Sequence, residues 1–184
     1  MESRILYHER PGKENTRATL EIARERAAAL GLDTVVLASS HGYTARQALE
    51  IFAGTGVKLI AVTICAGYTA EGWTMKDSER RELEAKGVRV LTGIHALGDD
   101  VSGSFDRTPP NAIVAQTLYR FSQGMKVAIE VALMAADAGC LAMDRDVIAI
   151  GGTDEGADTA IVLTPAYPRK FSELSVREIL AKPR

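Results

Sequence analysis

The sequence predicts a single α/β domain, residues 1–184, in which helices cover both faces of a mostly parallel sheet. Short β-branched runs alternate along the chain with longer segments of helical periodicity, which is typical of such three-layer folds. The runs VVLA, LIAVTI and VIAI are almost wholly apolar, as strands buried on both faces are. With 46% hydrophobic residues, the chain is long enough to bury the core of one domain.

Local patterns predict most of the elements. The first helix ends at Gly31, because apolar residues recur at helical spacing before it and glycine is favoured just beyond a helix end. A second helix starts with a capping box that begins at Thr44, and the highly charged segment 76–86 is at most an exposed helix. A capping box that begins at Ser175 predicts a last short helix. Strands are expected at 5–8, 34–38, 58–64, 88–92, 147–151 and 159–164.

The second half of the chain contains a long loop and a long helical pattern. Residues 93–110 are rich in Gly, Asp and Ser and exceed an ordinary connection in length, which predicts a lid or binding loop. Thr108 and Pro109 supply an N-cap and a first-turn proline for a helix that runs to Ala138. Such a helix is too long for a domain of this size, so the step at 122–124 is expected to bend or break it.

Composition excludes several classes of function. A net charge of −2 with scattered basic residues gives no surface for nucleic acid. No apolar run approaches the roughly 20 residues of a membrane helix and no targeting segment is evident, so a cytoplasmic location without membrane association is expected. Cys65 and Cys140 are expected as reduced thiols, and no metal-ligand spacing surrounds them. The common dinucleotide, nucleoside triphosphate, hydrolase and metalloprotease motifs are absent.

The loop SSHGYT, which follows the expected strand at 34–38, is the strongest candidate site. In parallel sheets, ligands bind outside the carboxyl ends of strands, near the point where strand order reverses. The loop offers hydroxyl groups and a flexible glycine just before a helix whose first N–H groups favour a phosphate or carboxylate. An ordinary serine-rich turn is the open alternative. The residues of the loop are Ser39, Ser40, His41, Gly42, Tyr43 and Thr44.

A second loop, in IGGTDEGADTA, joins the fifth and sixth expected strands. Gly151 and Gly152 permit close approach of a ligand beside Thr153, although a tight glycine turn has the same pattern. Asp154 and Glu155 would repel a phosphate, which is therefore assigned to the serine loop. The two acids are too isolated to predict a metal site.

Three histidines and a cysteine, His8, His41, His95 and Cys65, fall at or just past the carboxyl ends of expected strands. Acid–base catalysis and a zinc site remain open, but lone histidines are more often structural. His95 is the preferred catalytic candidate because it begins the long loop. No metal is predicted.

The run VVLASSHGYTARQAL followed by KLIAVT resembles the C-terminal domain of pyruvate kinase. In that family the corresponding strand, loop and helix hold a phosphate of the allosteric sugar bisphosphate. Stand-alone archaeal and bacterial proteins of this fold are similar also in PGKENT, HAL, FSQGMKV, MAADAG and IGGTDEGADTAIVLTPA. The resemblance implies an α/β/α sandwich of strand order 3-2-1-4-5 counted from TVVLA, with the last strand antiparallel and an added N-terminal strand. It does not imply kinase activity, because the barrel with its metal and substrate residues is missing.

Some stand-alone members are associated with flavin mononucleotide (FMN), so the resemblance implies a phosphorylated ligand, with FMN as the preferred cofactor and the reaction open. A regulatory module that binds a sugar phosphate or nucleotide without catalysis is the main alternative, and a self-assembling structural subunit is the third. A homo-oligomer is expected, with Lys126, Glu130 and Asp137 as a stripe facing solvent or a second subunit. The residues expected around the ribityl chain and ring are Asn15, Thr16, Gly67, His95, Gly152 and Thr153.

Overall fold

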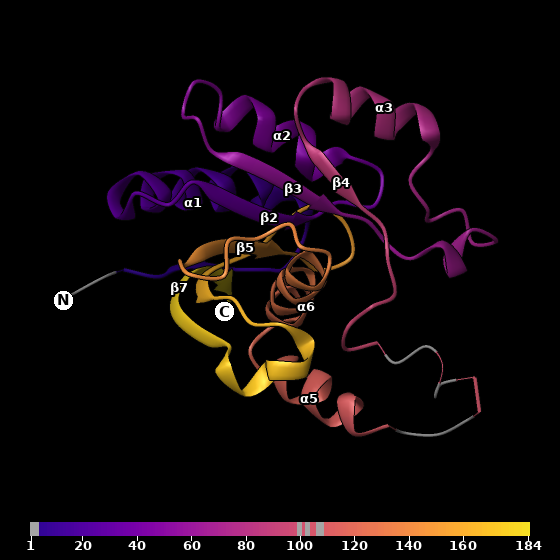
Figure 1. Ribbon diagram of the computed structural model, residues 1–184. Coiled ribbons are helices and arrows are strands. Elements are labelled where there is room, and N and C mark those ends of the chain that lie inside the picture. The colour runs from indigo at the N-terminus through magenta and orange to yellow at the C-terminus, as the bar shows by residue number, and fades with distance from the viewer. Residues whose placement is uncertain (1–3, 99–100, 102–103, 106–108) are drawn as a thin grey trace.

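A seven-stranded sheet forms the centre of the computed structural model, which describes residues 4–98, 101, 104–105 and 109–184 (Figure 1). The strand order is β1-β7-β6-β5-β2-β3-β4. β2 pairs in parallel with both β3 and β5, and β3 pairs in parallel with β4, whereas β6 is antiparallel to β5 and to β7. The strands are β1 Leu6–His8, β2 Thr34–Ala38, β3 Lys58–Val62, β4 Arg89–Leu91, β5 Val147–Gly151, β6 Thr159–Thr164 and β7 Ser175–Pro183.

This order confirms the predicted topology. Counted from β2, the central strands follow 3-2-1-4-5, and the last of them, β6, is antiparallel. The added N-terminal strand β1 lies at the edge of the sheet and pairs in parallel with β7. Since β3 and β5 lie on opposite sides of β2, the strand order reverses at β2.

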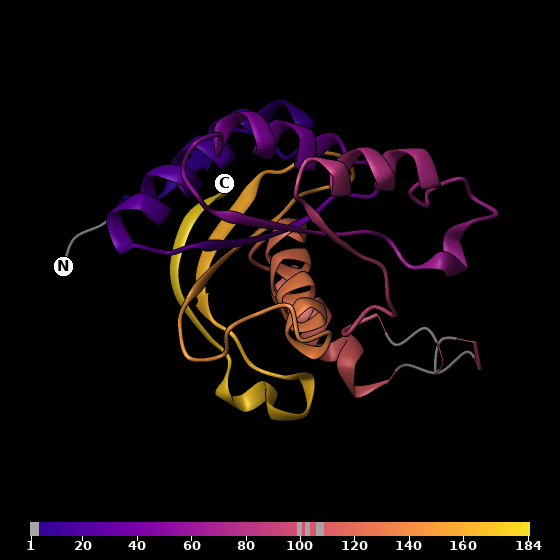
Figure 2. The same cartoon turned by 45° about the horizontal axis from the view of Figure 1, so that its top comes forward.

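Helices cover both faces of the sheet: α1, α2 and α3 lie on one face, and α5 and α6 on the other (Figures 1 and 2). Within the described residues, no helix is both long and apolar enough to span a bilayer. The charged segment near residue 80 is an exposed helix, α3, as predicted. The helices are α1 Thr16–Leu30, α2 Tyr43–Ile51, α3 Asp77–Ala85, α5 Pro110–Leu118 and α6 Gln123–Asp137, with short 3-10 helices η1 Lys13–Asn15, η2 Ala66–Tyr68 and η3 Pro168–Glu173.

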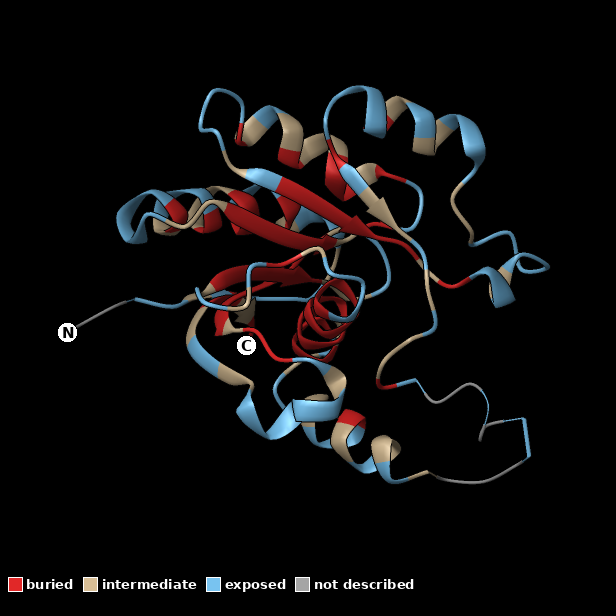
Figure 3. Cartoon of the chain, in the orientation of Figure 1, coloured by how far each residue is buried: buried red, intermediate tan, exposed pale blue. Residues whose placement is uncertain are grey.

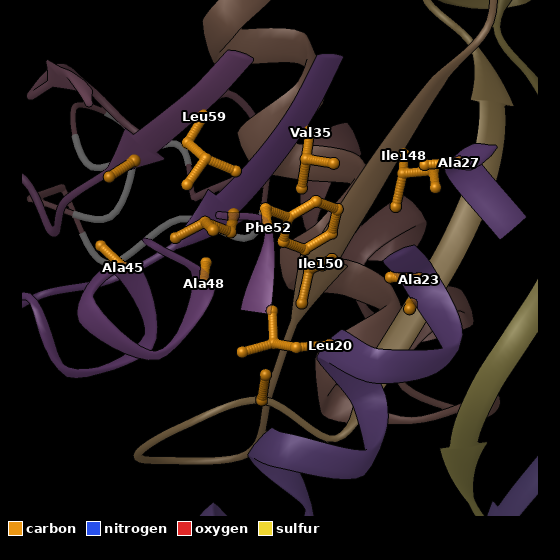
Figure 4. Packing of buried hydrophobic residues seen from close by; sticks show 14 of the residues in the cluster. Leu20, Ala23, Ala27, Val35, Ala45, Ala48, Phe52, Leu59, Ile148 and Ile150 are labelled. Carbon is orange, nitrogen blue, oxygen red and sulfur yellow. The ribbon is translucent and has the colours of Figure 1, made fainter. Parts of the chain in front are cut away.

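Alternate residues of the central strands belong to two separate hydrophobic cores. Val35 and Leu37 of β2 pack under α1 and α2, whereas Val36 packs under α6. This alternation follows from the two-residue repeat of a strand. Figure 3 shows the central strands and α6 as buried, and Figure 4 shows the first core around Phe52.

The C-terminal segment is a strand, so the short helix predicted from Ser175 is wrong. β7 lies between β6 and β1, and its backbone therefore pairs on both sides. The side chain of Glu178, the other member of the expected capping box, instead accepts two hydrogen bonds from Arg26 of α1, at 2.8 and 2.6 Å. Backbone pairing with two distant strands outweighs the local helical preference.

The long helical pattern is divided into α5 and α6, which confirms the predicted break. Ser122 is the N-cap of α6, and its hydroxyl accepts the N–H of Met125 at 2.9 Å. Helix α5 starts at Pro110 with Pro109 as N-cap, one residue later than expected. The expected N-cap, Thr108, lies outside the described residues. Gly31 ends α1 in the left-handed conformation, as predicted.

Candidate functional site

The SSHGYT loop lies at the carboxyl end of β2, where the strand order reverses. On one side, the N–H of Ser39 donates to the carbonyl of Val62 at the end of β3, at 2.9 Å. On the other side, β5 ends in the GGTDEG loop, beside the end of β2. The two candidate loops therefore meet at the switch point of the sheet.

Helix α2 begins directly after Gly42, which adopts the left-handed conformation with φ of 82°. The capping box expected from Thr44 is therefore wrong, because Thr44 already lies in the first turn. The hydroxyl of Ser39 accepts the N–H of Ala45 instead, at 3.2 Å. The left-handed glycine turns the chain into the helix early, so that the buried Ser39 reaches this N–H.

The start of α2 presents several backbone N–H groups. Within the described part of the chain, the N–H groups of Gly42, Tyr43 and Thr44 donate no hydrogen bond. Ser40, next to them on the loop, is exposed. Such N–H groups carry partial positive charge at a helix start, so the loop suits an anion with several oxygen atoms.

Two basic residues of the segment, Arg46 and His41, contact acids of α3. Arg46 donates to the carbonyl of His41 at 3.0 Å, and its guanidinium is 3.1 Å from Glu82 of α3. His41 Nδ1 lies 3.3 Å from Glu79. Hydrogen bonds from Lys86 and Arg46 lower the pKa of Glu82. Because the carboxylate of Glu82 balances the charge of Arg46, the backbone donors of the loop are the main source of attraction for an anion.

Asp158 is a fully buried carboxylate that joins the loop before α1 to the loop after β5. Its Oδ2 accepts the N–H groups of Gly12 and Thr153, each at 3.1 Å, and its Oδ1 accepts the hydroxyl of Thr159 at 2.8 Å. Sequence analysis assigned this residue no role. The available signal was an acid placed directly before the apolar run of β6, where a charge needs partners.

The same network reaches the start of α6. Ser122 Oγ lies 3.0 Å from Thr159 Oγ1. A Cβ on Gly124 would clash with the Thr159 hydroxyl and would lie 2.6 Å from Asp158 Oδ1, so only glycine fits. The FSQGMKV segment, which resembles the family, therefore places the N-terminus of α6 at the same edge of the sheet as that of α2.

Lys13 links the loop before α1 to both candidate loops. Its Nζ lies 2.7 Å from Glu155 Oε1 in the GGTDEG loop and 4.2 Å from the centre of the Tyr43 ring. The hydrogen bond to Glu155 raises the pKa of Lys13. Lys13 and Glu155 are both exposed, so an anionic ligand between the loops would compete with Glu155 for the Lys13 ammonium group.

Asn15 and Thr16 are occupied by contacts within the protein. Asn15 donates its side-chain amide to the carbonyl of Arg10 at 2.8 Å. Thr16, which is buried, donates its hydroxyl to the carbonyl of Lys13 at 2.6 Å and accepts the N–H of Ala157 at 3.0 Å. Both side chains hold the loops in place, and Asn15 is the more accessible of the two.

The paired glycines after β5 serve close packing of the chain itself. A Cβ on Gly151 would clash with the carbonyl of Gly124 in α6, and one on Gly152 with the carbonyl of Gly156. Thr153 is half-buried, and its N–H donates to the carboxylate of Asp158. The two glycines were expected to let a ligand approach the backbone closely. In the structure, backbone carbonyls of the same chain lie close to them instead.

His95 and Cys65 come together beyond β3 and β4, where the N–H of Cys65 lies 3.4 Å from His95 Nε2. Gly67 follows on the exposed 3-10 helix η2. His8 is buried elsewhere, with Nε2 2.9 Å from Thr19 Oγ1, and burial lowers its pKa against the opposing charge of Asp158. The histidines therefore occupy separate surroundings. Among the described residues, no three His, Cys, Asp or Glu side chains gather as metal ligands, and both cysteines are free thiols.

The interpretation of Lys126 and Glu130 as a solvated or subunit-facing stripe is wrong, because the two side chains are only 9% and 7% exposed. Their charged atoms lie 2.5 Å apart, and Glu130 also accepts the N–H of Leu97 at 2.8 Å. The segment that contains Leu97 covers this part of α6, which sequence periodicity cannot show. Asp137 alone of the stripe is exposed.

Two hollows in the described surface lie away from the candidate loops. One includes Gly31 and Gly56, at the opposite edge of the sheet, and the other includes Arg26 and Glu178 between α1 and β7. Neither is lined by residues of the SSHGYT or GGTDEG loops.

Comparison with known proteins identifies related chains. A family model described as pyruvate kinase, alpha/beta domain, matches residues 17–163, which include both candidate loops. A crystal structure of a pyruvate kinase from Cryptosporidium parvum is similar, with 14% sequence identity and a TM-score of 0.45. That match covers 82% of this chain and 23% of the pyruvate kinase chain. The chain thus spans less than a quarter of the length of that protein.

Proposed function

The chain belongs to the pyruvate kinase α/β domain family, and we propose that it binds a phosphorylated small molecule, FMN, at residues 39–44. One observation carries the proposal. The N–H groups of Gly42, Tyr43 and Thr44 have no acceptor among the described residues, and they lie at the switch point of the sheet. A phosphate has enough oxygen atoms to accept from all three.

The loop residues take different roles in this proposal. Gly42 gives the backbone turn that directs the N–H groups to one place, and Ser39 holds that turn through Ala45. Ser40, exposed beside the N–H groups, donates its hydroxyl to the phosphate. Lys13, whose Nζ lies over the Tyr43 ring, contributes positive charge.

The site is proposed for binding, with the reaction open. His95 is the candidate acid–base group, because it lies at the same edge of the sheet beyond β4 and contacts Cys65. A regulatory module would use the same phosphate donors for a sugar phosphate or nucleotide without a chemical step. An FMN site must also recognise the ribityl chain and the flavin ring, whereas a regulatory module must recognise a sugar or a nucleoside.

FMN should bind at least tenfold more tightly than riboflavin. Hydrogen bonds to a charged phosphate are worth about 1.5 to 3 kcal/mol each, and about 1.4 kcal/mol is tenfold in affinity. Calorimetric titration of the purified protein with FMN and, separately, with riboflavin measures the ratio of the two affinities. Equal affinities would contradict the phosphate assignment, whereas binding of a sugar phosphate with neither flavin bound would favour the regulatory module.

Self-association is a further part of the proposal, because large apolar side chains remain exposed on α5 and just after it, and on η3 and just before it. Figures 1 and 2 show α5 and η3 side by side, and both contact α6. Exposed apolar patches of this kind mark interaction surfaces, and a second copy of the chain would cover them. Light scattering at micromolar concentration should give a mass above that of one chain; a single-chain mass would contradict this. The side chains are Ile113, Phe121, Tyr167 and Phe171.

A further inference from the structure

Three aromatic rings form a continuous stack next to the end of β3. The rings of Trp73 and Tyr68 have centroids 5.4 Å apart and planes inclined by 16°, and those of Tyr68 and His95 have centroids 6.1 Å apart and planes inclined by 24°. Trp73 is 53% exposed at the outer end of the stack. Trp73 is the one tryptophan of the sequence, and its indole lies largely in solvent. The segment that carries it follows the buried strand β3.

The segment that carries Tyr68 and Trp73 and the proposed phosphate loop follow neighbouring parallel strands, β3 and β2. The N–H of Ser39 donates to the carbonyl of Val62, the last residue of β3, and Cys65 follows three residues later in the sequence. In Figures 1 and 2 the segment 66–73 projects from the end of β3, on the edge where β2 also ends. The stack and the serine loop therefore lie at the same edge of the sheet, with the stack on the β3 side.

The inner end of the stack is held in place by buried groups. His95 Nε2 lies 3.4 Å from the N–H of Cys65, which ties the segment after β4 to the segment after β3. Two residues beyond His95, the N–H of Leu97 donates to the buried carboxylate of Glu130, which is also paired with Lys126. The stack thus has an anchored inner ring and an exposed outer ring.

We propose that the Trp73–Tyr68–His95 stack binds a planar heteroaromatic ring carried by the phosphorylated ligand. This inference rests on the proposed function and extends it, since it requires a flavin or a nucleobase beyond the phosphate and excludes a simple sugar phosphate as the complete ligand. Parallel stacks leave a flat apolar face at their exposed end, and a planar ring gains by covering it. Aromatic side chains bind bases in this way without a need for specific hydrogen bonds.

The test uses Trp73→Ala, with Trp73→Phe as the conservative control and FMN, riboflavin and ribose 5-phosphate as probes. Trp73→Ala should lower the affinity for FMN and for riboflavin by about five- to a hundredfold, as loss of one stacking ring does. The affinity for ribose 5-phosphate should stay within twofold of the wild type. Trp73→Phe should retain most of the flavin affinity. Because Trp73 is exposed, the thermal midpoint of the ligand-free variant should stay near that of the wild type.

Several outcomes would overturn the inference. If Trp73→Ala binds FMN within twofold of the wild type, the stack does not hold the ring. If the wild type binds ribose 5-phosphate as tightly as FMN, the phosphate site stands and the ring site fails. If Trp73→Ala changes the mass measured by light scattering while flavin affinity is unchanged, the stack is a contact between subunits. By contrast, if Ser40→Asp loses affinity for ribose 5-phosphate and keeps its affinity for riboflavin, the result supports a ring site separate from the phosphate site.

Discussion

Replacing Asp158 with alanine should lower the free energy of unfolding by about 3 kcal/mol or more. The change removes the acceptor of the N–H groups of Gly12 and Thr153, and it removes one of the two hydrogen-bond partners of the Thr159 hydroxyl. Asp158 itself is fully buried. Each unsatisfied buried donor costs about 1–3 kcal/mol, and solvent entering the cavity recovers only part of this. Urea denaturation followed by circular dichroism measures the difference.

Glu155→Ala is the matched control, because Glu155 is an exposed acid on the same loop that pairs only with Lys13 in the described structure. Exposed ion pairs contribute about 0–1 kcal/mol, so this variant should lie close to the wild type. If Asp158→Ala were as stable as Glu155→Ala, the buried network would not be what holds the N-terminal loop against the loop after β5.

Ser40→Asp should weaken FMN binding by at least tenfold while the ligand-free protein stays folded. The variant loses a hydroxyl donor to the phosphate, worth about 1.5 to 3 kcal/mol, and adds a like charge beside it. An acidic side chain near the start of α2 is itself favourable by roughly 0.3 to 1 kcal/mol, so the thermal midpoint should hardly move. Calorimetric titration with FMN, together with thermal unfolding, measures both effects.

Ser40→Asn separates charge from shape, because asparagine matches aspartate in size and carries no charge. The asparagine variant should bind FMN more tightly than the aspartate variant, and the difference should shrink at high salt as exposed charges are screened. An aspartate variant that binds FMN within a factor of about two of the wild type would mean that Ser40 does not contact the phosphate, and the loop would then be a structural turn.

The sheet and its edge loops were predictable, because the information is local or topological. The runs VVLA and VIAI are buried on both faces and lie side by side as β2 and β5. Once strand order was expected to reverse at β2, the position of the SSHGYT loop at the switch point followed. The break between α5 and α6 was likewise marked by its own residues, with Ser122 as N-cap.

Features that depend on distant partners could not be predicted from local pattern. A capping box starting at Ser175 is a valid helix signal, yet β7 gains two neighbouring strands that the signal does not contain. The capping box expected from Thr44 does not form either, because α2 already starts after Gly42 and the hydroxyl of Ser39 accepts an N–H of its first turn. Short motifs describe only their own hydrogen bonds and not the competing ones.

The buried charges show the same limit. Asp158 receives a hydrogen bond from Gly12, 146 positions away in the sequence, so no window around Asp158 contains the reason for it. Lys126 and Glu130 have the spacing of an exposed helical ion pair. Their burial depends on the segment that carries Leu97, which reaches Glu130 only in the folded chain.

The central claim is that a phosphate binds the backbone at the start of α2, and nuclear magnetic resonance of the amide groups tests it most directly. In a titration of ¹⁵N-labelled protein with FMN, the amide signals of Gly42, Tyr43 and Thr44 should show large, saturable shifts, and inorganic phosphate at high concentration should shift the same three. The claim would be contradicted if these signals stayed unchanged while FMN shifted amides at the opposite edge of the sheet, around Gly31 and Gly56.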